Sequence, residues 1–214
     1  IVPFFPDQLE RDAPQSERFF ALPQAKNNLT SFLIRHPSIP SLYSLNAARI
    51  DVIPYQFKPV MKLIRSDMPR LLIADGVGIG KTIEAGLILR ELQIRNGIKS
   101  VLIVCPKPLV TERKWELEMR RFDEDFEPLD SVKLNYCMAE CRREGCWPTK
   151  YAKAILPFSV CDERVLHQLQ KLDPAPKFDL VIVDEAHHIR NPQSLRHQVV
   201  REFCESATAI VFLT

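Results

Sequence analysis

Short apolar runs without polar alternation recur along the chain from residue 71 onward, and stretches with helical spacing separate them. The runs predict strands at 71–74, 100–105, 154–160, 178–183 and 208–213, with a weaker strand at 132–136. The stretches between them predict helices at 81–95, 111–122, 162–172 and 195–204. Strands that are apolar on both faces and alternate with helices are typical of a parallel sheet covered by helices. The sequence therefore predicts an α/β fold, a three-layer sandwich with a mainly parallel sheet.

The first part of the chain has a different character. Residues 1–48 are rich in proline, which disfavours helices and central strands. One stretch, 24–35, has the pattern of a short helix. The sequence predicts an N-terminal arm or appendage over 1–48, followed by the α/β domain over 49–214.

The composition excludes only a few classes of protein. Hydrophobic residues make up 46% and charged residues 26% of the chain, and the net charge is +2, as in ordinary globular proteins. No apolar run is long enough to cross a bilayer, and the first residues do not resemble a signal peptide. We expect an intracellular, cytoplasmic protein with no membrane partner, in which the six cysteines are reduced.

A glycine-rich turn lies between the first predicted strand and the helix that follows it. It contains Gly78 and Gly80 and runs directly into Lys81 and Thr82. Such a turn lets backbone N–H groups surround phosphates, while the lysine reaches the β- and γ-phosphates and the hydroxyl binds Mg²⁺. The strict pattern has a further glycine where this chain has Asp75. The alternative is a glycine-rich turn that binds nothing.

An acidic pair, Asp184 and Glu185, ends the apolar run at 178–183. Carboxylates at the end of a buried strand are costly unless cations accompany them, and a metal–phosphate cluster provides such cations. Asp184 would then hold Mg²⁺, and Glu185 would orient and deprotonate the attacking water. The alternative is an aspartate that caps the following helix.

Five stretches, in order along the chain, resemble motifs of the Swi/Snf-like branch of helicase superfamily two. They are 53–56 (Gln motif), 74–86 (motif I), 104–106 with Leu109, Trp115 and Glu118 (motif Ia and its helix), 184–191 (motif II) and 211–214 (the opening of motif III). Within this branch, the motifs resemble those of bacterial remodelers and defence helicases. The branch usually has Asp at the position of Asp75, but it has Glu where this chain has Gly76, which loosens the loop.

The resemblance implies a RecA-like P-loop NTPase lobe that uses ATP and Mg²⁺. Gln56 would bond the adenine edge, Tyr55 would pack nearby, and His187 would link the nucleotide site to motif III. Lys107 and Ser159 would contact the nucleic-acid strand. Without the resemblance, Gln56 reads as a polar residue at a helix start and Tyr55 as a half-buried ring. His187 then reads as a core histidine and Lys107 as a solvated surface lysine.

The resemblance also implies a function, an ATP-driven translocase or remodeling motor on double-stranded DNA. Its second RecA-like lobe would lie in the same protein beyond Thr214, so this chain alone is expected to bind ATP but hardly hydrolyse it. Two alternatives stay open: an RNA helicase, and a nucleotide-dependent switch or scaffold without turnover. Arg190, Asn191 and Trp115 favour the Swi/Snf-like branch over the RNA helicase.

Two weaker signals lie between the motifs. Cysteines at 137, 141 and 146, with Cys161, suggest zinc ligands, but they lack the CxxC pairs typical of structural zinc sites. We therefore expect no zinc. The basic residues around them, 142, 143, 150 and 153, read either as a phosphate-contacting patch or as the solvated face of a loop.

Overall fold

The computed structural model describes residues 53–66, 69–74, 76 and 80–214. The expected arm at 1–48, its helix at 24–35, and the loop positions Asp75 and Gly78 lie outside the described residues. Residues 55–214 belong to one compact unit of the chain.

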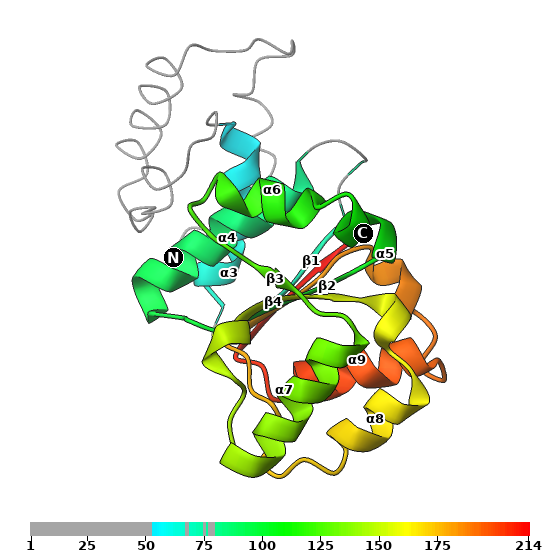
Figure 1. The fold of residues 1–214 in the computed structure, drawn as a ribbon. Helices are drawn as coiled ribbons and strands as arrows, with labels where there is room; N and C mark the ends of the chain where they lie inside the picture. The colour runs from blue at the N-terminus through cyan, green and yellow to red at the C-terminus, as the bar shows by residue number, and fades with distance from the viewer. Residues whose placement is uncertain (1–52, 67–68, 75, 77–79) are drawn as a thin grey trace. The chain divides into compact units, whose positions relative to one another are not determined.

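A six-stranded sheet forms the centre of this unit (Figure 1). Its strands are β1 (Arg70–Ile73), β2 (Val101–Cys105), β3 (Glu127–Pro128), β4 (Lys153–Pro157), β5 (Leu180–Val183) and β6 (Ala209–Leu213). They lie in the order β1-β6-β5-β2-β4-β3, and every neighbouring pair is parallel. The predicted α/β fold with a parallel sheet is confirmed.

Helices cover both faces of the sheet (Figure 1). One layer contains α3 (Lys58–Ile64), α4 (Lys81–Asn96) and α6 (Lys114–Arg120), and the other contains α7 (Ser131–Glu144), α8 (Glu163–Leu169) and α9 (Leu195–Glu205). The short helix α5 (Lys107–Thr111) follows β2, and 3₁₀ turns lie at η2 (Pro54–Phe57), η3 (Thr149–Tyr151), η4 (Phe158–Val160) and η5 (Ala186–Ile189). None of the described helices is both long and apolar enough to span a membrane.

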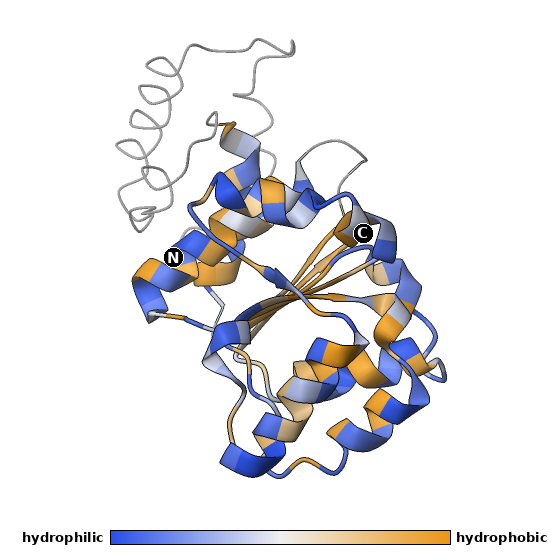
Figure 2. Ribbon diagram, viewed as in Figure 1, coloured by the Kyte–Doolittle hydropathy of each residue, from blue (hydrophilic) through white to orange (hydrophobic). Residues whose placement is uncertain are grey.

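The core lies between the sheet and these two helical layers. Strands β2 and β5 are buried at every position, because helices cover them on both sides. Figure 2 shows the same arrangement as apolar strands and helices that are apolar on one side. The unbroken apolar runs of the sequence are therefore the central strands of the sheet.

Helix α4 packs closely against the segment that follows α6. A Cβ atom at Gly86 would lie 2.2 Å from Cε2 of Phe122, so only glycine lets the ring approach the helix. Next to this contact the buried carboxylate of Glu124 accepts hydrogen bonds from Arg90 (3.2 Å), Gln93 (2.8 Å) and Lys153. These bonds connect α4 to the start of β4 and fix the helix that begins at the candidate phosphate loop.

Two predicted elements were wrong. The expected strand at 132–136 is part of helix α7, whose buried side chains recur every three or four residues at Leu134, Cys137, Met138 and Cys141. The expected helix at 111–122 is divided into α5 and α6 by Arg113, which has a left-handed backbone (φ 56°). Strand β3 was not expected, since two residues give no pattern.

Candidate nucleotide-binding site

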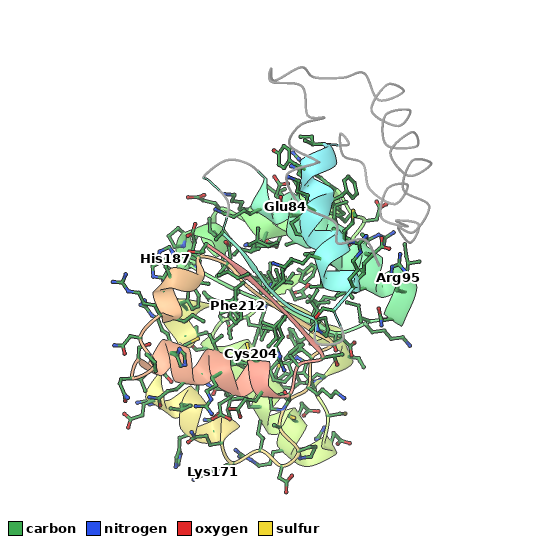
Figure 3. All side chains as sticks on the ribbon, turned by 180° about the vertical axis from the view of Figure 1, so that it is seen from behind. Glu84, Arg95, Lys171, His187, Cys204 and Phe212 are labelled. Carbon is green, nitrogen blue, oxygen red and sulfur yellow. The ribbon has the colours of Figure 1, made fainter. Side chains whose placement is uncertain are left out.

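The predicted site residues lie where the parallel strands end. Lys81 and Thr82 follow β1 and its loop, Lys107 follows β2, and Asp184 follows β5. Because all strands are parallel, their carboxyl ends meet at one edge of the sheet, where α/β folds bind ligands. His187 lies at the same edge, just beyond the end of β5 (Figure 3).

The candidate phosphate loop leads directly into α4, a helix of 16 residues. Gly80 is its N-cap, with φ 97°, a conformation that favours glycine, and its carbonyl accepts the N–H groups of Ile83 (2.8 Å) and Glu84 (3.1 Å). Lys81 and Thr82 are the first two residues of the helix. A helix N-terminus that is preceded by glycine and begins with lysine is suited to an anionic phosphate.

Gln56 lies against this loop. A Cβ atom at Gly80 would be 2.5 Å from Nε2 of Gln56, and the side chain of Gln56 is buried. The neighbouring Tyr55 is 40% exposed. The structure therefore places Gln56, the predicted adenine contact, against Gly80 at the end of the candidate phosphate loop.

Asp184 is a buried carboxylate with one hydrogen bond on each oxygen. Trp115 donates its indole N–H to Oδ2 at 2.9 Å, and the backbone N–H of Glu185 donates to Oδ1 at 2.8 Å. Burial raises the pKa of Asp184, and the hydrogen bond from Trp115 opposes this only in part. The alternative role as a helix cap does not apply, because the N-cap of η5 is Glu185.

Glu185 has a strained backbone next to this buried carboxylate. Its φ and ψ are both 50°, a left-handed conformation that costs a non-glycine residue about 1–2 kcal/mol. Its Oε2 atom lies 3.3 Å from Nδ1 of His187. Strain of this kind is common at functional sites.

Mg²⁺ matches the donors at this edge. It prefers hard oxygen ligands and usually keeps several of its waters, so one carboxylate and one hydroxyl suffice from the protein. Asp184 supplies a carboxylate whose oxygens each retain lone pairs beyond their one hydrogen bond. Thr82 supplies the hydroxyl. Within the described ranges no cluster of three or more His, Cys, Asp or Glu side chains is arranged to enclose a metal ion.

Sequence reasoning missed the role of Trp115, which was assigned only to the motif Ia helix. It also missed His197 on α9, whose Nδ1 lies 2.7 Å from the carbonyl oxygen of Ile189 and ties α9 to the turn after Glu185. No periodic signal identifies such contacts, because Trp115 and Asp184 are 69 positions apart in the chain.

The two predicted nucleic-acid contacts lie on neighbouring strands. Lys107 follows β2 and Ser159 follows β4, and these strands pair in register up to Cys105 and Pro157. Both side chains are exposed at the same edge as the nucleotide-binding residues. Their placement is compatible with one continuous ligand, but their role stays a prediction.

Among the described residues, these cysteines are not part of any group of three or more side chains that could hold a metal ion. Cys137 and Cys141 are buried on α7, Cys161 is buried after η4, and Cys146 is exposed. Burial raises the pKa of Cys137 and of Cys161 to about 12, which disfavours the thiolate form that binds zinc. The expectation of no zinc stays a prediction.

The basic cluster around them is partly neutralised. Arg143 bonds to Glu140 at 2.7 Å and to Glu144 at 2.9 Å, and Lys153 bonds to the buried Glu124. The segment at 142–144 belongs to α7 and is not the loop that we expected. Two of the four cations thus have carboxylate partners within the domain.

Comparison with known proteins identifies the family. The model of the SNF2-related domain matches residues 55–212. The chain belongs to the SNF2-related domain family. This match starts at Tyr55 and covers the whole sheet except the last residue of β6, so the resemblance drawn from the motifs is confirmed.

Curated relatives agree with this assignment. The RNA polymerase-associated protein RapA of Photobacterium profundum is 29% identical over 99% of this chain and 22% of that protein. RapA of Pasteurella multocida is 31% identical over 98% of this chain and 21% of that protein, and RapA of Klebsiella pneumoniae is 33% identical over 79% and 17%. The chain thus spans about a fifth of the length of these relatives.

Solved structures show the same fold. The Sulfolobus solfataricus SWI2/SNF2 ATPase core in complex with dsDNA aligns with a TM-score of 0.61 and 20% identity, over 82% of this chain and 34% of that chain. The SWI2/SNF2 ATPase core domain of the same organism aligns with a TM-score of 0.58. The domain therefore has the RecA-like α/β fold of these ATPase cores.

Proposed function

We propose that this domain is the ATP-binding lobe of an ATP-driven motor that moves along double-stranded DNA and remodels what is bound to it. The observation that carries the proposal is the buried carboxylate of Asp184. It lies at the same edge of the sheet as the N-terminus of α4, and each of its oxygens accepts one hydrogen bond, from Trp115 or from the backbone of Glu185. Mg·ATP bound at this edge would supply a cation next to this carboxylate.

Each side chain has a distinct part in hydrolysis. Lys81 and the N-terminus of α4 hold the phosphates, Gln56 and Tyr55 face the base, and Thr82 with Asp184 hold the metal ion. Bound Mg²⁺ neutralises charge that develops on the phosphates. Glu185 accepts the proton of the attacking water, and the nearby His187 steadies its carboxylate at 3.3 Å.

DNA is proposed as the track because the site residues share an edge with exposed Lys107 and Ser159. A Sulfolobus solfataricus protein with this fold carries double-stranded DNA in its solved complex, and the RapA relatives are named for RNA polymerase. Since these relatives are much longer, we propose that a second RecA-like lobe of the same protein closes over the ATP. A strand of nucleic acid crossing the ends of β2 and β4 would then lie beside the nucleotide.

The decisive experiment separates binding from chemistry in the whole protein. Lys81→Ala is expected to remove most of the ATP affinity measured by calorimetry, whereas Glu185→Gln keeps the affinity and lowers phosphate release by roughly 10²–10⁴-fold. Near-normal turnover in Glu185→Gln would contradict the assignment of the general base.

The choice of nucleic acid is tested in the same assay. Phosphate release by the whole protein is expected to rise with duplex DNA, and Lys107→Ala is expected to require more DNA for the same stimulation. Stimulation by RNA alone would favour an RNA helicase, and tight ATP binding without turnover would favour a switch.

This chain by itself should bind ATP but turn it over very slowly. Phosphoryl transfer in this class of motor depends on an arginine from a second lobe, a contribution of roughly 10³–10⁵ in rate. Phosphate release by the 214-residue chain, with and without duplex DNA, measures this directly. Strong DNA-stimulated turnover would show that one lobe completes the site.

A further inference from the structure

The contact between Trp115 and Asp184 joins two parts of the site. Trp115 lies on α6, its side chain is 1% exposed, and its Nε1–H donates to Oδ2 of Asp184 at 2.9 Å. Helix α6 starts after the left-handed Arg113, so this indole is placed by a helix that is separate from α5. The bond therefore ties the segment after β2 to the carboxylate at the end of β5.

This bond fixes the direction of the carboxylate. The N–H of Glu185 donates to Oδ1 and the indole of Trp115 donates to Oδ2, so each oxygen has its own donor. An aspartate side chain has two rotatable bonds, and a donor on each oxygen restricts both. Any residue except proline at position 185 would supply the backbone N–H, whereas the indole N–H depends on tryptophan at position 115.

Burial alone does not explain a tryptophan here. A phenylalanine would also be apolar, and it would avoid a polar N–H in the interior. The N–H instead meets a carboxylate, an acceptor that is itself costly to bury without a cation. Donors that orient a metal-binding side chain usually change metal affinity by about 10–100-fold when they are removed.

We propose that Trp115 is a positioning residue that holds the Asp184 carboxylate in the orientation that binds the Mg²⁺ of Mg·ATP. This proposal rests on the proposed function, since it requires that Asp184 meets the metal ion. It predicts that the indole N–H, and not the bulk of the ring, sets the part of nucleotide affinity that depends on Mg²⁺.

The second tryptophan provides a matched control. Trp147 packs edge-on against Phe178 and Phe203, with centroid distances of 5.3 and 6.2 Å, and donates its N–H to the backbone carbonyl of Tyr151 at 3.0 Å. It therefore also has an aromatic ring in the domain and a bonded N–H, but its acceptor is not a site residue. Trp147→Phe removes a comparable donor.

The test measures the affinity of this chain for a non-hydrolysable ATP analogue by calorimetry, with Mg²⁺ and with a chelator. Trp115→Phe is expected to lower the affinity about 10–100-fold with Mg²⁺ and leave it unchanged with the chelator. Trp147→Phe is expected to change neither value. In an Asp184→Ala background, Trp115→Phe should have no further effect, because its partner is gone.

Loss of folding in Trp115→Phe is controlled with an isostere. In the Trp147→Phe background, 3-benzothienylalanine at position 115 keeps the size of the ring and replaces its N–H with sulfur. The same Mg²⁺-specific loss is expected, and normal Mg²⁺ dependence with this isostere would overturn the proposal.

In the unsubstituted chain, the indole N–H resonance of Trp115 should shift on adding Mg²⁺ to the nucleotide complex, while that of Trp147 stays in place. An unsubstituted chain that binds the analogue equally with and without Mg²⁺ would overturn the proposed function and this role together.

Discussion

Two aspartates flank the same strand and have opposite environments. Asp179 precedes β5, and its Oδ2 accepts the N–H groups of Lys99 (2.8 Å) and Ser100 (2.9 Å) and the hydroxyl of Ser100 (3.0 Å). Burial alone would raise the pKa of Asp179, but these hydrogen bonds and the charge of Lys177 outweigh it and lower the pKa. Asp184 follows β5, and burial raises its pKa.

The difference gives Asp179 a structural role and is consistent with the proposed role of Asp184 as a metal ligand. The charge of Asp179 is satisfied by groups of the protein, so this carboxylate fastens the start of β5 to the start of β2. The charge of Asp184 is only partly satisfied, by Trp115 and Glu185, and burial still disfavours it. A buried group of this kind at the carboxyl edge of a parallel sheet is a candidate for function.

The largest expected effect that separates the two is on catalysis. Asp184→Ala in the whole protein is expected to lower the rate of ATP hydrolysis by at least about 100-fold, because loss of a metal ligand exceeds loss of a residue that merely orients one. Asp179→Ala should leave the rate per folded molecule unchanged. Steady-state phosphate release, corrected for the folded fraction by circular dichroism, measures both.

Equal losses in the two variants would break the comparison. They would show either that the loss of Asp179 disturbs the nucleotide site by displacing β5, or that Asp184 has only a structural role. Asp184→Asn is a useful companion, because it keeps the size of the side chain and removes the charge that attracts the metal ion.

The strands of this fold could be predicted because burial on both faces leaves unbroken apolar runs. Helix α7 could not, since Val132, Leu134 and Tyr136 alternate as in a strand. The structure exposes Val132 and Tyr136 and buries Leu134 on a helix that starts at the N-cap Asp130, which accepts the N–H of Lys133. The alternation of apolar residues at 132–136 therefore does not reflect a strand, and packing against the rest of the domain favours a helix there.

The features of the candidate site also divide into those that the sequence predicts and those that it does not. Lys81, Thr82, Asp184 and Glu185 carry local signals, because phosphate and metal chemistry demand particular residues at strand ends. The bond from Trp115 to Asp184 and the left-handed backbone of Glu185 carry none, since each arises only when separate segments pack together. Sequence therefore predicts which groups react but not what holds them in position.

A second, smaller effect concerns stability. Asp179→Ala is expected to lower the free energy of unfolding by about 1–3 kcal/mol, because it leaves the N–H groups of Lys99 and Ser100 without their acceptor. Asp184→Ala should cost less, since losing the acceptor of Trp115 is offset by removing a buried charge. Urea unfolding of the chain in the absence of divalent cations compares them.

The control for this effect is Asp179→Asn. All three donors bond to one oxygen, Oδ2, so an asparagine carbonyl can accept the same bonds without charge. This variant should therefore keep most of the stability that alanine loses. A larger loss in Asp184→Ala than in Asp179→Ala would show that the carboxyl end of β5 is the more important structural anchor.

The smallest effect is a pair of opposite pH dependences. Folding lowers the pKa of Asp179, so its contribution to stability is complete above the unfolded pKa of about 3.9 and is lost as the pH falls through the folded pKa. Folding raises the pKa of Asp184, so its contribution is complete below that unfolded value and is lost as the pH rises through the folded pKa. Urea unfolding from acidic to neutral pH, without divalent cations, should show the advantage of the unsubstituted chain over Asp179→Asn shrinking in acid. Its stability relative to Asp184→Asn should instead decline as the pH rises toward neutral. If the stability differences of the two variants changed with pH in the same direction, the two carboxylates would not differ in how well the protein stabilises their charge. The argument that Asp184 is a cation site would then fail.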